Sequence, residues 1–131
     1  MKIAIIGLGL IGGSMARRLR GFHGCEIAAY NRTRESLDLA LSDGVIDIAC
    51  DTPGEAMSDA DIIIMCLYPQ LNIDFVRDNL GSIKNGAVVT DVSGVKGFII
   101  REMKKILPRY RGFHRRTSHG RQGSGRIQEL Y

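Results

Sequence analysis

The chain has 131 residues and a formal net charge of +4, with 18 Lys and Arg against 14 Asp and Glu. The charge is unevenly divided, because residues 1–107 carry 12 basic and 13 acidic residues (net −1) whereas residues 108–131 carry six Arg and one Glu (net +5). Because the net positive charge lies in the last 24 positions, this distribution argues against a nucleic-acid-binding protein. The three widely spaced cysteines favour a cytoplasmic protein without disulfides or a metal site. No apolar run is long enough to span a membrane.

The first predicted element is a short apolar strand over residues 2–6, which runs directly into a turn with the pattern G-x-G-x-x-G. In a dinucleotide-binding turn, Gly7 permits the sharp change of direction, Gly9 lets the backbone approach a pyrophosphate, and Gly12 lets the next helix pack on the strand. That helix is predicted over residues 14–20, and its first turn favours phosphate. The predicted cofactor contacts are Gly7, Leu8, Gly9, Leu10, Ile11 and Gly12. The alternative is a plain strand-to-helix turn.

The rest of the chain up to residue 107 alternates strands with helices. Strands are predicted over 26–30, 45–50, 60–67 and 86–92, and helices over 34–42, 52–57, 70–80 and 95–107. The helix at 70–80 is expected to bury Leu71, Phe75 and Val76. The alternation predicts an α/β protein with a Rossmann-type doubly wound parallel sheet, whose ligand lies beyond the carboxyl ends of the strands. Residues 1–107 form the predicted NAD(P)-binding domain, and residues 108–131 a disordered basic tail.

The end of the second strand is where such domains distinguish NAD from NADP. An acidic residue there accepts hydrogen bonds from the adenosine ribose, but this chain has Tyr30-Asn31-Arg32-Thr33 instead. Asn31 avoids repelling a 2′-phosphate, and Arg32 and Thr33 can bind one, so the sequence leans slightly towards NADP over NAD. In the alternative, Asn31 caps the next helix and Arg32 is a solvated surface cation.

Two further strand ends carry candidate residues. Asp91, Ser93 and Lys96 follow the fifth strand, where the nicotinamide would lie, and Ser93 and Lys96 are candidates to orient a carboxylated substrate. The alternative for Ser93 is a cap of the last helix. Leu67 follows the fourth strand and is expected to line the cofactor cleft by packing.

Three motifs together resemble the prephenate/arogenate dehydrogenase family of tyrosine biosynthesis: the glycine-rich turn with Gly13-Ser14 after it, Gly44-Val45-Ile46-Asp47, and Thr90-Asp91-Val92 with Val95-Lys96-Gly97. The resemblance covers residues 1 to about 107. It implies NAD(P)-dependent oxidation of prephenate or arogenate with loss of CO₂, a histidine that takes the hydroxyl proton, and a homodimer of the full-length enzyme.

The chain departs from that family in two ways. Gly94 stands where the family often has a serine before Val-Lys, and the family's His-Pro-Met-Ala-Gly segment and helical dimerisation domain are missing. No catalytic histidine is therefore assigned, and the chain alone is expected to be inactive. Residues 113–121 have possible codons that, read one nucleotide later, encode Phe-Ile-Gly-Ala-His-Pro-Met-Ala-Gly, so our hypothesis is a frameshift with premature termination. The alternatives are a short natural protein with a basic tail, a non-catalytic dinucleotide-binding module, and a fragment of a β-hydroxyacid-type NADP dehydrogenase.

Overall fold

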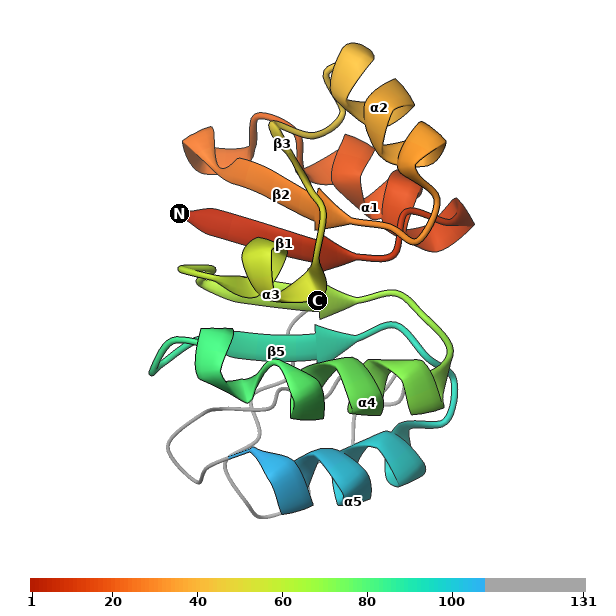
Figure 1. Cartoon of the computed structure of the whole chain (residues 1–131), viewed down its shortest axis with the longest axis vertical. Coiled ribbons are helices and arrows are strands. Elements are labelled where there is room, and N and C mark those ends of the chain that lie inside the picture. The colour runs from red at the N-terminus through yellow and green to blue at the C-terminus, as the bar shows by residue number, and fades with distance from the viewer. Residues whose placement is uncertain (108–131) are drawn as a thin grey trace.

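A computed structural model describes residues 1–107, and the predicted tail at 108–131 lies outside the described residues (Figure 1). Five parallel strands form one sheet in the order β3-β2-β1-β4-β5. Their bounds are β1 Lys2–Ile6, β2 Glu26–Tyr30, β3 Ile48–Cys50, β4 Ile62–Met65 and β5 Val88–Asp91. This order, which reverses direction beside β1, confirms the predicted Rossmann-type sheet.

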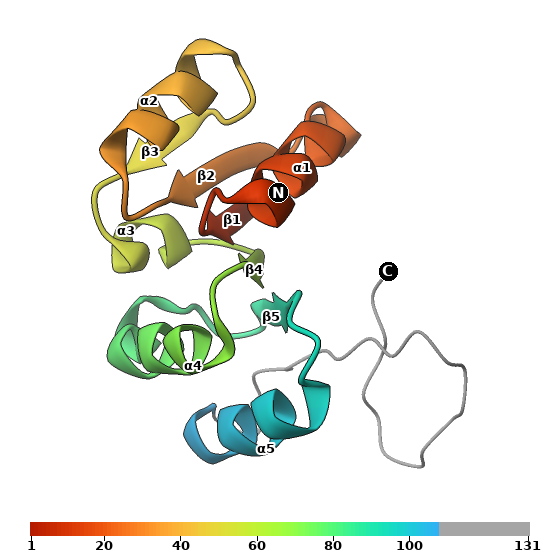
Figure 2. The same ribbon diagram turned by 90° about the vertical axis from the view of Figure 1, so that its right-hand side faces the viewer.

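Helices cover both faces of the sheet (Figure 2). On one face lie α1 and α2, and on the other lie α3, α4 and α5. The bounds are α1 Leu10–Leu19, α2 Arg34–Ser42, α3 Pro53–Met57, α4 Pro69–Asp78 and α5 Lys96–Ile106, with short 3-10 turns at Phe22–Gly24 and Leu80–Ser82. None of the helices in the described part is long and apolar enough to cross a membrane.

The core is split into two layers by the alternation of side chains along the strands. In β1, Ile3 and Ile5 pack under α1 and α2, whereas Ala4 and Ile6 belong to the layer under the other three helices. Because both faces are covered, each strand reads as a continuous apolar run instead of an alternating one. Polar chemistry is therefore expected where the strands begin and where they end. We call these two rims of the sheet its amino edge and its carboxyl edge.

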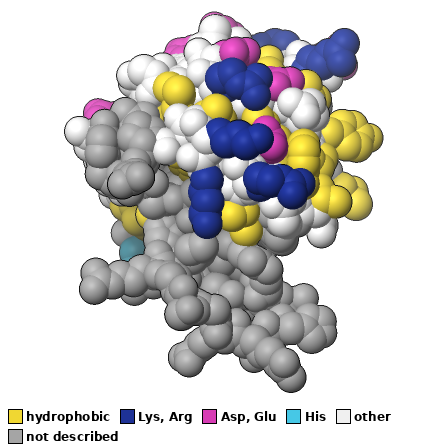
Figure 3. Space-filling view, turned by 90° about the horizontal axis from the view of Figure 1, so that it is seen from below, with side chains coloured by type: hydrophobic (Ala, Val, Ile, Leu, Met, Phe, Trp, Pro, Cys, Tyr) yellow, Lys and Arg dark blue, Asp and Glu magenta, His cyan; other side chains and the backbone are white. Residues whose placement is uncertain are grey.

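The outer surface of α5 carries exposed basic side chains, at Arg101, Lys104 and Lys105. A view from the α5 end shows basic side chains gathered on this face (Figure 3). Lys105 pairs with Glu102 on the same helix at 3.0 Å, and both lysines stand in the last turn, where cations offset the helix dipole. These residues therefore have a local role in the helix.

Several predicted boundaries were wrong. Helix α1 begins at Leu10, four residues earlier than predicted, so Gly12 lies inside the helix. Strand β3 is limited to residues 48–50, because Val45 and Ile46 are buried in the turn that precedes it. The predicted buried face of α4 was partly wrong as well: Leu71 is 41% exposed, and Asn72 and Ile73 are buried beside Val76. A polar residue in the buried face of a helix obscures its apolar period.

Candidate functional site

Gly7 and Gly12 are required by the packing of the turn itself. Gly7 follows β1 with φ +100°, and a Cβ there would lie 2.7 Å from Leu67 Cδ2. A Cβ on Gly12 would lie 1.8 Å from the carbonyl oxygen of Gly7, far inside van der Waals contact. These two glycines therefore bring α1 against the end of β1, as the sequence pattern predicts.

Gly9 differs from both, because, apart from its immediate chain neighbours, no atom of residues 1–107 lies within 4 Å of the position that its Cβ would occupy. It is the N-cap of α1, it makes no side-chain capping bond, and the first turn holds no acidic residue. The neighbouring side chains point away from the core: Leu10 is 92% exposed and Ile11 54%. The first N–H groups of α1 thus have no capping side chain and stand at the positive end of the helix dipole, an arrangement that suits an anion.

Asn31 holds this turn instead of capping a helix. Its Oδ1 accepts a hydrogen bond from the N–H of Leu8 at 2.9 Å, and its Nδ2 donates to the carbonyl of Thr33 at 3.3 Å. The N-cap of α2 is Thr33, without a side-chain bond, so the alternative role predicted for Asn31 was wrong. Arg32 and Thr33 are exposed beside it.

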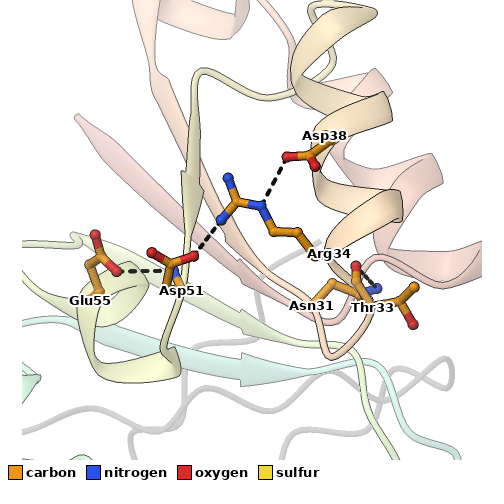
Figure 4. A network of polar contacts seen from close by, with 6 residues as sticks. All are labelled: Asn31, Thr33, Arg34, Asp38, Asp51 and Glu55. Carbon is orange, nitrogen blue, oxygen red and sulfur yellow. Dashed lines mark hydrogen bonds and ion pairs between the residues drawn. The ribbon is translucent and has the colours of Figure 1, made fainter.

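A polar network links the ends of β2 and β3 (Figure 4). Arg34, the first residue of α2, contacts Asp38 through Nε at 2.9 Å and also pairs with Asp51, which follows β3. The N–H of Asp51 donates to Glu55 Oε2 at 3.0 Å. The hydrogen bond and charge of Asp38, followed by those of Asp51, raise the pKa of Arg34. Sequence reasoning missed this network, since only Arg34 and Asp38 have a local spacing that signals a contact.

Leu67 lies directly under the turn, and Asn72 of α4 fixes its backbone. Asn72 is completely buried; its Oδ1 accepts from the N–H of Leu67 at 3.0 Å, and its Nδ2 donates to the Leu67 carbonyl at 3.2 Å. Such a two-point bond supplies the partners of Leu67, the residue after the last backbone bond between this strand and β1, which the N–H of Cys66 donates to the carbonyl of Ile6 at 2.8 Å. Sequence reasoning also missed Asn72, although an Asn within an apolar helix face was a usable signal.

Asp91 and Ser93 lie at the end of β5. Asp91 is 2% exposed, and one of its carboxylate oxygens accepts from the N–H of Ser93 at 2.9 Å. The Oγ of Ser93 is buried and has no hydrogen-bond partner among the described residues. Ser93 does not cap α5, whose N-cap is Val95, so that alternative was wrong. Lys96 is the first residue of α5, and its side chain is outside the described part of the structure.

Cys66 lies between β4 and Leu67, close to Gly12. Burial, and secondly the charge of Asp91, raise the pKa of its thiol to about 12. The thiol therefore stays neutral near pH 7 and fills space beneath the turn. Within residues 1–107, no group of three or more His, Cys, Asp or Glu side chains is placed to hold a metal ion.

Comparison with known proteins identifies this arrangement. The family described as the NAD binding domain of 6-phosphogluconate dehydrogenase matches residues 2–110. Cyclohexadienyl dehydrogenase of Zymomonas mobilis is 28% identical over 110 residues, which are 82% of this chain and 37% of that protein. The crystal structure of Synechocystis arogenate dehydrogenase is 30% identical with a TM-score of 0.76, over 86% of this chain and 39% of that one.

A second similar structure bears on the cofactor. Prephenate dehydrogenase from A. aeolicus, in complex with hydroxyphenyl propionate and NAD+, is 25% identical with a TM-score of 0.75, over 84% of this chain and 39% of that one. The chain thus spans less than half the length of these relatives. Their similarity gives the expected lean towards NADP no support, because the matched family and this complex both concern NAD. The chain belongs to the family of NAD-binding domains described for 6-phosphogluconate dehydrogenase, and it is similar over most of its length to part of the prephenate and arogenate dehydrogenases.

Proposed function

We propose that this chain is the cofactor-binding part of an NAD-dependent dehydrogenase that oxidises prephenate or arogenate with loss of CO₂. The observation that carries the proposal is the open space at Gly9, at the start of a helix with no capping side chain and no acid in its first turn. Gly7 and Gly12 are explained by contacts within the protein, whereas the glycine at position 9 is explained by a ligand that approaches the backbone.

The residues that would hold the dinucleotide are the turn from Gly7 to Gly12, Asn31 and Leu67. Backbone N–H groups of α1 would bind the pyrophosphate, and Asn31 keeps the turn in place through its bond to Leu8. Bound NAD supplies the acceptor for a hydride. Asn72, by holding Leu67, keeps the floor of the site rigid, and the neutral thiol of Cys66 adds no charge there.

At the end of β5, the buried hydroxyl of Ser93 supports a role in orienting the substrate. A buried hydroxyl with no partner among residues 1–107 is unusual and calls for one from a ligand or water. Ser93 and Lys96, both close to the start of α5, are proposed to orient the substrate's carboxylate. The division into a domain over 1–107 and a tail over 108–131, together with the frameshift, stays a proposal that sequencing of the encoding DNA would test.

Titration calorimetry of the 131-residue chain with NAD+ tests the cofactor. Gly9→Ala would place a methyl group where the pyrophosphate approaches, so we expect affinity to fall at least about tenfold, or 1.4 kcal/mol. Gly81→Ala is the matched control, because Gly81 also has no atom within 4 Å of its Cβ position but lies in the turn Leu80–Ser82, away from the site. Equal affinity in the Gly9 variant, the control and the parent would contradict dinucleotide binding at this turn.

NADH formation from prephenate and from arogenate tests the reaction and separates a dehydrogenase from a non-catalytic module. We expect no turnover by the 131-residue chain alone, since loss of a positioned general base typically costs about 10²–10⁴ in rate. Residues 1–107 contain one histidine, His23, in the 3-10 turn Phe22–Gly24. This turn follows the C-terminal end of α1, whereas the glycine turn precedes its N-terminal end, so His23 is not placed to act as the base. Robust turnover by this chain would overturn that expectation and assign the base to residues it contains.

A further inference from the structure

The carboxyl ends of β2 and β3 lie side by side, because Tyr30 pairs in register with Cys50. Asn31 and Asp51, the next residues of the two strands, therefore occupy equivalent positions at the same edge of the sheet. The acidic residue that usually reads the ribose stands at the end of β2. In this chain that position is the amide Asn31, and a carboxylate, Asp51, stands at the equivalent position of the neighbouring strand.

The side chain of Asn31 is already used by the protein. Its Oδ1 accepts from the N–H of Leu8 and its Nδ2 donates to the carbonyl of Thr33, at 2.9 and 3.3 Å. Asn31 thus shapes the turn, and the choice between a ribose hydroxyl and a 2′-phosphate has to be made by other groups nearby. The groups at hand belong to the network of Figure 4.

We call this set the β2–β3 charge cluster; it comprises Arg34, Asp38, Asp51 and Glu55, which are linked by hydrogen bonds and ion pairs and are all exposed. One arginine stands with three carboxylates, so the cluster is net negative by two charges. Arg34, which follows Thr33 directly, is held between Asp38 and Asp51 (Figure 4). Its positive charge is therefore offset before any ligand arrives.

We propose that Arg34 and Asp51 form a specificity-determining pair that makes the site favour NAD over NADP. The proposal rests on the proposed binding of a dinucleotide at the glycine turn. A 2′-phosphate at the end of β2 would meet the negative field of Asp51, and it would have to compete with two carboxylates for Arg34, so that of the two arginines only Arg32 is left to attract it. NAD lacks this phosphate, so Asp51 does not repel it and it does not compete for Arg34. In other domains of this fold an acid at the end of β2 discriminates against NADP; here Asp51, which follows β3, would take that role.

Two substitutions with opposite expected signs test the pair. Asp51→Asn removes a negative charge and releases Arg34, so the NADP to NAD affinity ratio should rise by about fivefold, the size expected for two unit charges about 4 Å apart when water screens them fully, as it does for exposed groups. Arg34→Gln leaves both carboxylates without their cation, so the same ratio should fall. Both changes should shrink at high salt, because the groups are exposed.

The measurement is calorimetric titration of the full 131-residue chain with NAD+ and NADP+ at low and high salt. Asp74→Asn is the matched control, since Asp74 is also ion-paired, with Arg77 at 3.1 Å, but lies on α4 on the opposite face of the sheet. Ratios that move in opposite directions for the two variants, with the control unchanged, support the pair. Binding of both dinucleotides with a ratio unaltered by either variant overturns the pair alone. No binding of either dinucleotide by the parent chain overturns the proposed function and the pair with it.

Discussion

At the amino edge of the sheet, carboxylates accept the backbone N–H groups of the first strand residues, whereas at the carboxyl edge α1 begins with no side-chain acceptor at all. Asp61 accepts from the N–H of Lys2 and Asp47 from that of Ile27, both at 2.8 Å. The start of α1 at Gly9 has no capping side chain and no acid in its first turn. Backbone N–H groups are therefore bound by carboxylates at one edge and have no side-chain cap at the other, where the proposed dinucleotide would bind.

The ion pairs at the two edges of the sheet also differ. At the amino edge, the hydrogen bond from Lys84 and then that from the backbone of Lys2 lower the pKa of Asp61. This lowered pKa stabilises the fold above the ordinary pKa of Asp, and the contribution is lost as the pH falls through the folded value. At the carboxyl edge, Arg34 and its two carboxylates are exposed and contact one another only through side chains. Asp61 thus ties its ion pair to the backbone of β1, whereas the pairs of Arg34 hold no strand backbone.

The largest expected effect is that of Gly12→Ala, which would break the carboxyl edge itself. Its Cβ would lie 1.8 Å from the Gly7 carbonyl oxygen, so the helix must move away from β1. We expect a loss of about 3 kcal/mol in the free energy of unfolding, measured in urea, together with loss of NAD+ binding.

Gly13→Ala is the matched control for that change. The neighbouring glycine of the same helix would gain a methyl group whose nearest atom, the Nη1 of Arg17, is 3.6 Å away. Because Ala is the better helix former, this variant should be as stable as the parent or more stable by up to about 1 kcal/mol. A comparable loss of stability in both variants would show that the helix, and not the close approach at Gly12, is what the substitution disturbs.

Smaller losses of stability are expected from substitutions of two asparagines, one near each end of α4. Asn72 binds the backbone of Leu67 near the carboxyl edge, whereas Asn79, just beyond the other end of the helix, donates to the carbonyl of Phe75 at 2.8 Å. Asn72→Ala leaves the N–H and carbonyl of Leu67 without their partner, and Asn79→Ala removes one local bond. We expect a stability loss of about 1–3 kcal/mol for Asn72→Ala and less for Asn79→Ala.

The affinity for NAD+, measured at a temperature where both variants are folded, distinguishes Asn72→Ala from Asn79→Ala. Only Asn72→Ala should weaken binding, by about fivefold or close to 1 kcal/mol, because only that residue holds the floor of the site. Equal affinity for the two variants would mean that Asn72 is structural and that Leu67 keeps its place without it.

The sequence predicted the fold to the extent that local patterns carry it. Strands β1 and β2 and helix α2 have the predicted bounds, since each is an apolar or amphipathic run closed by a turn. Two of the boundaries that shifted lie where a turn residue is buried, as at Ile46, and where a helix begins inside a glycine run, as at Gly12. The strands predicted over 60–67 and 86–92 are also shorter, as β4 and β5, and the helix predicted over 70–80 is Pro69–Asp78. Burial of a loop residue depends on its neighbours in space, and no local period reports it.

The sequence by itself determined the parallel α/β sheet, the turn at Gly7, Gly9 and Gly12, and the resemblance to a dehydrogenase domain, because those features depend on residues close together in the chain. Only the tertiary structure decided what the polar side chains at the strand ends do. Asn31 meets Leu8 across 23 positions, and Arg34 meets Asp51 across 17. Both contacts exist because parallel strands bring their carboxyl ends to one edge, a pairing that no local spacing encodes.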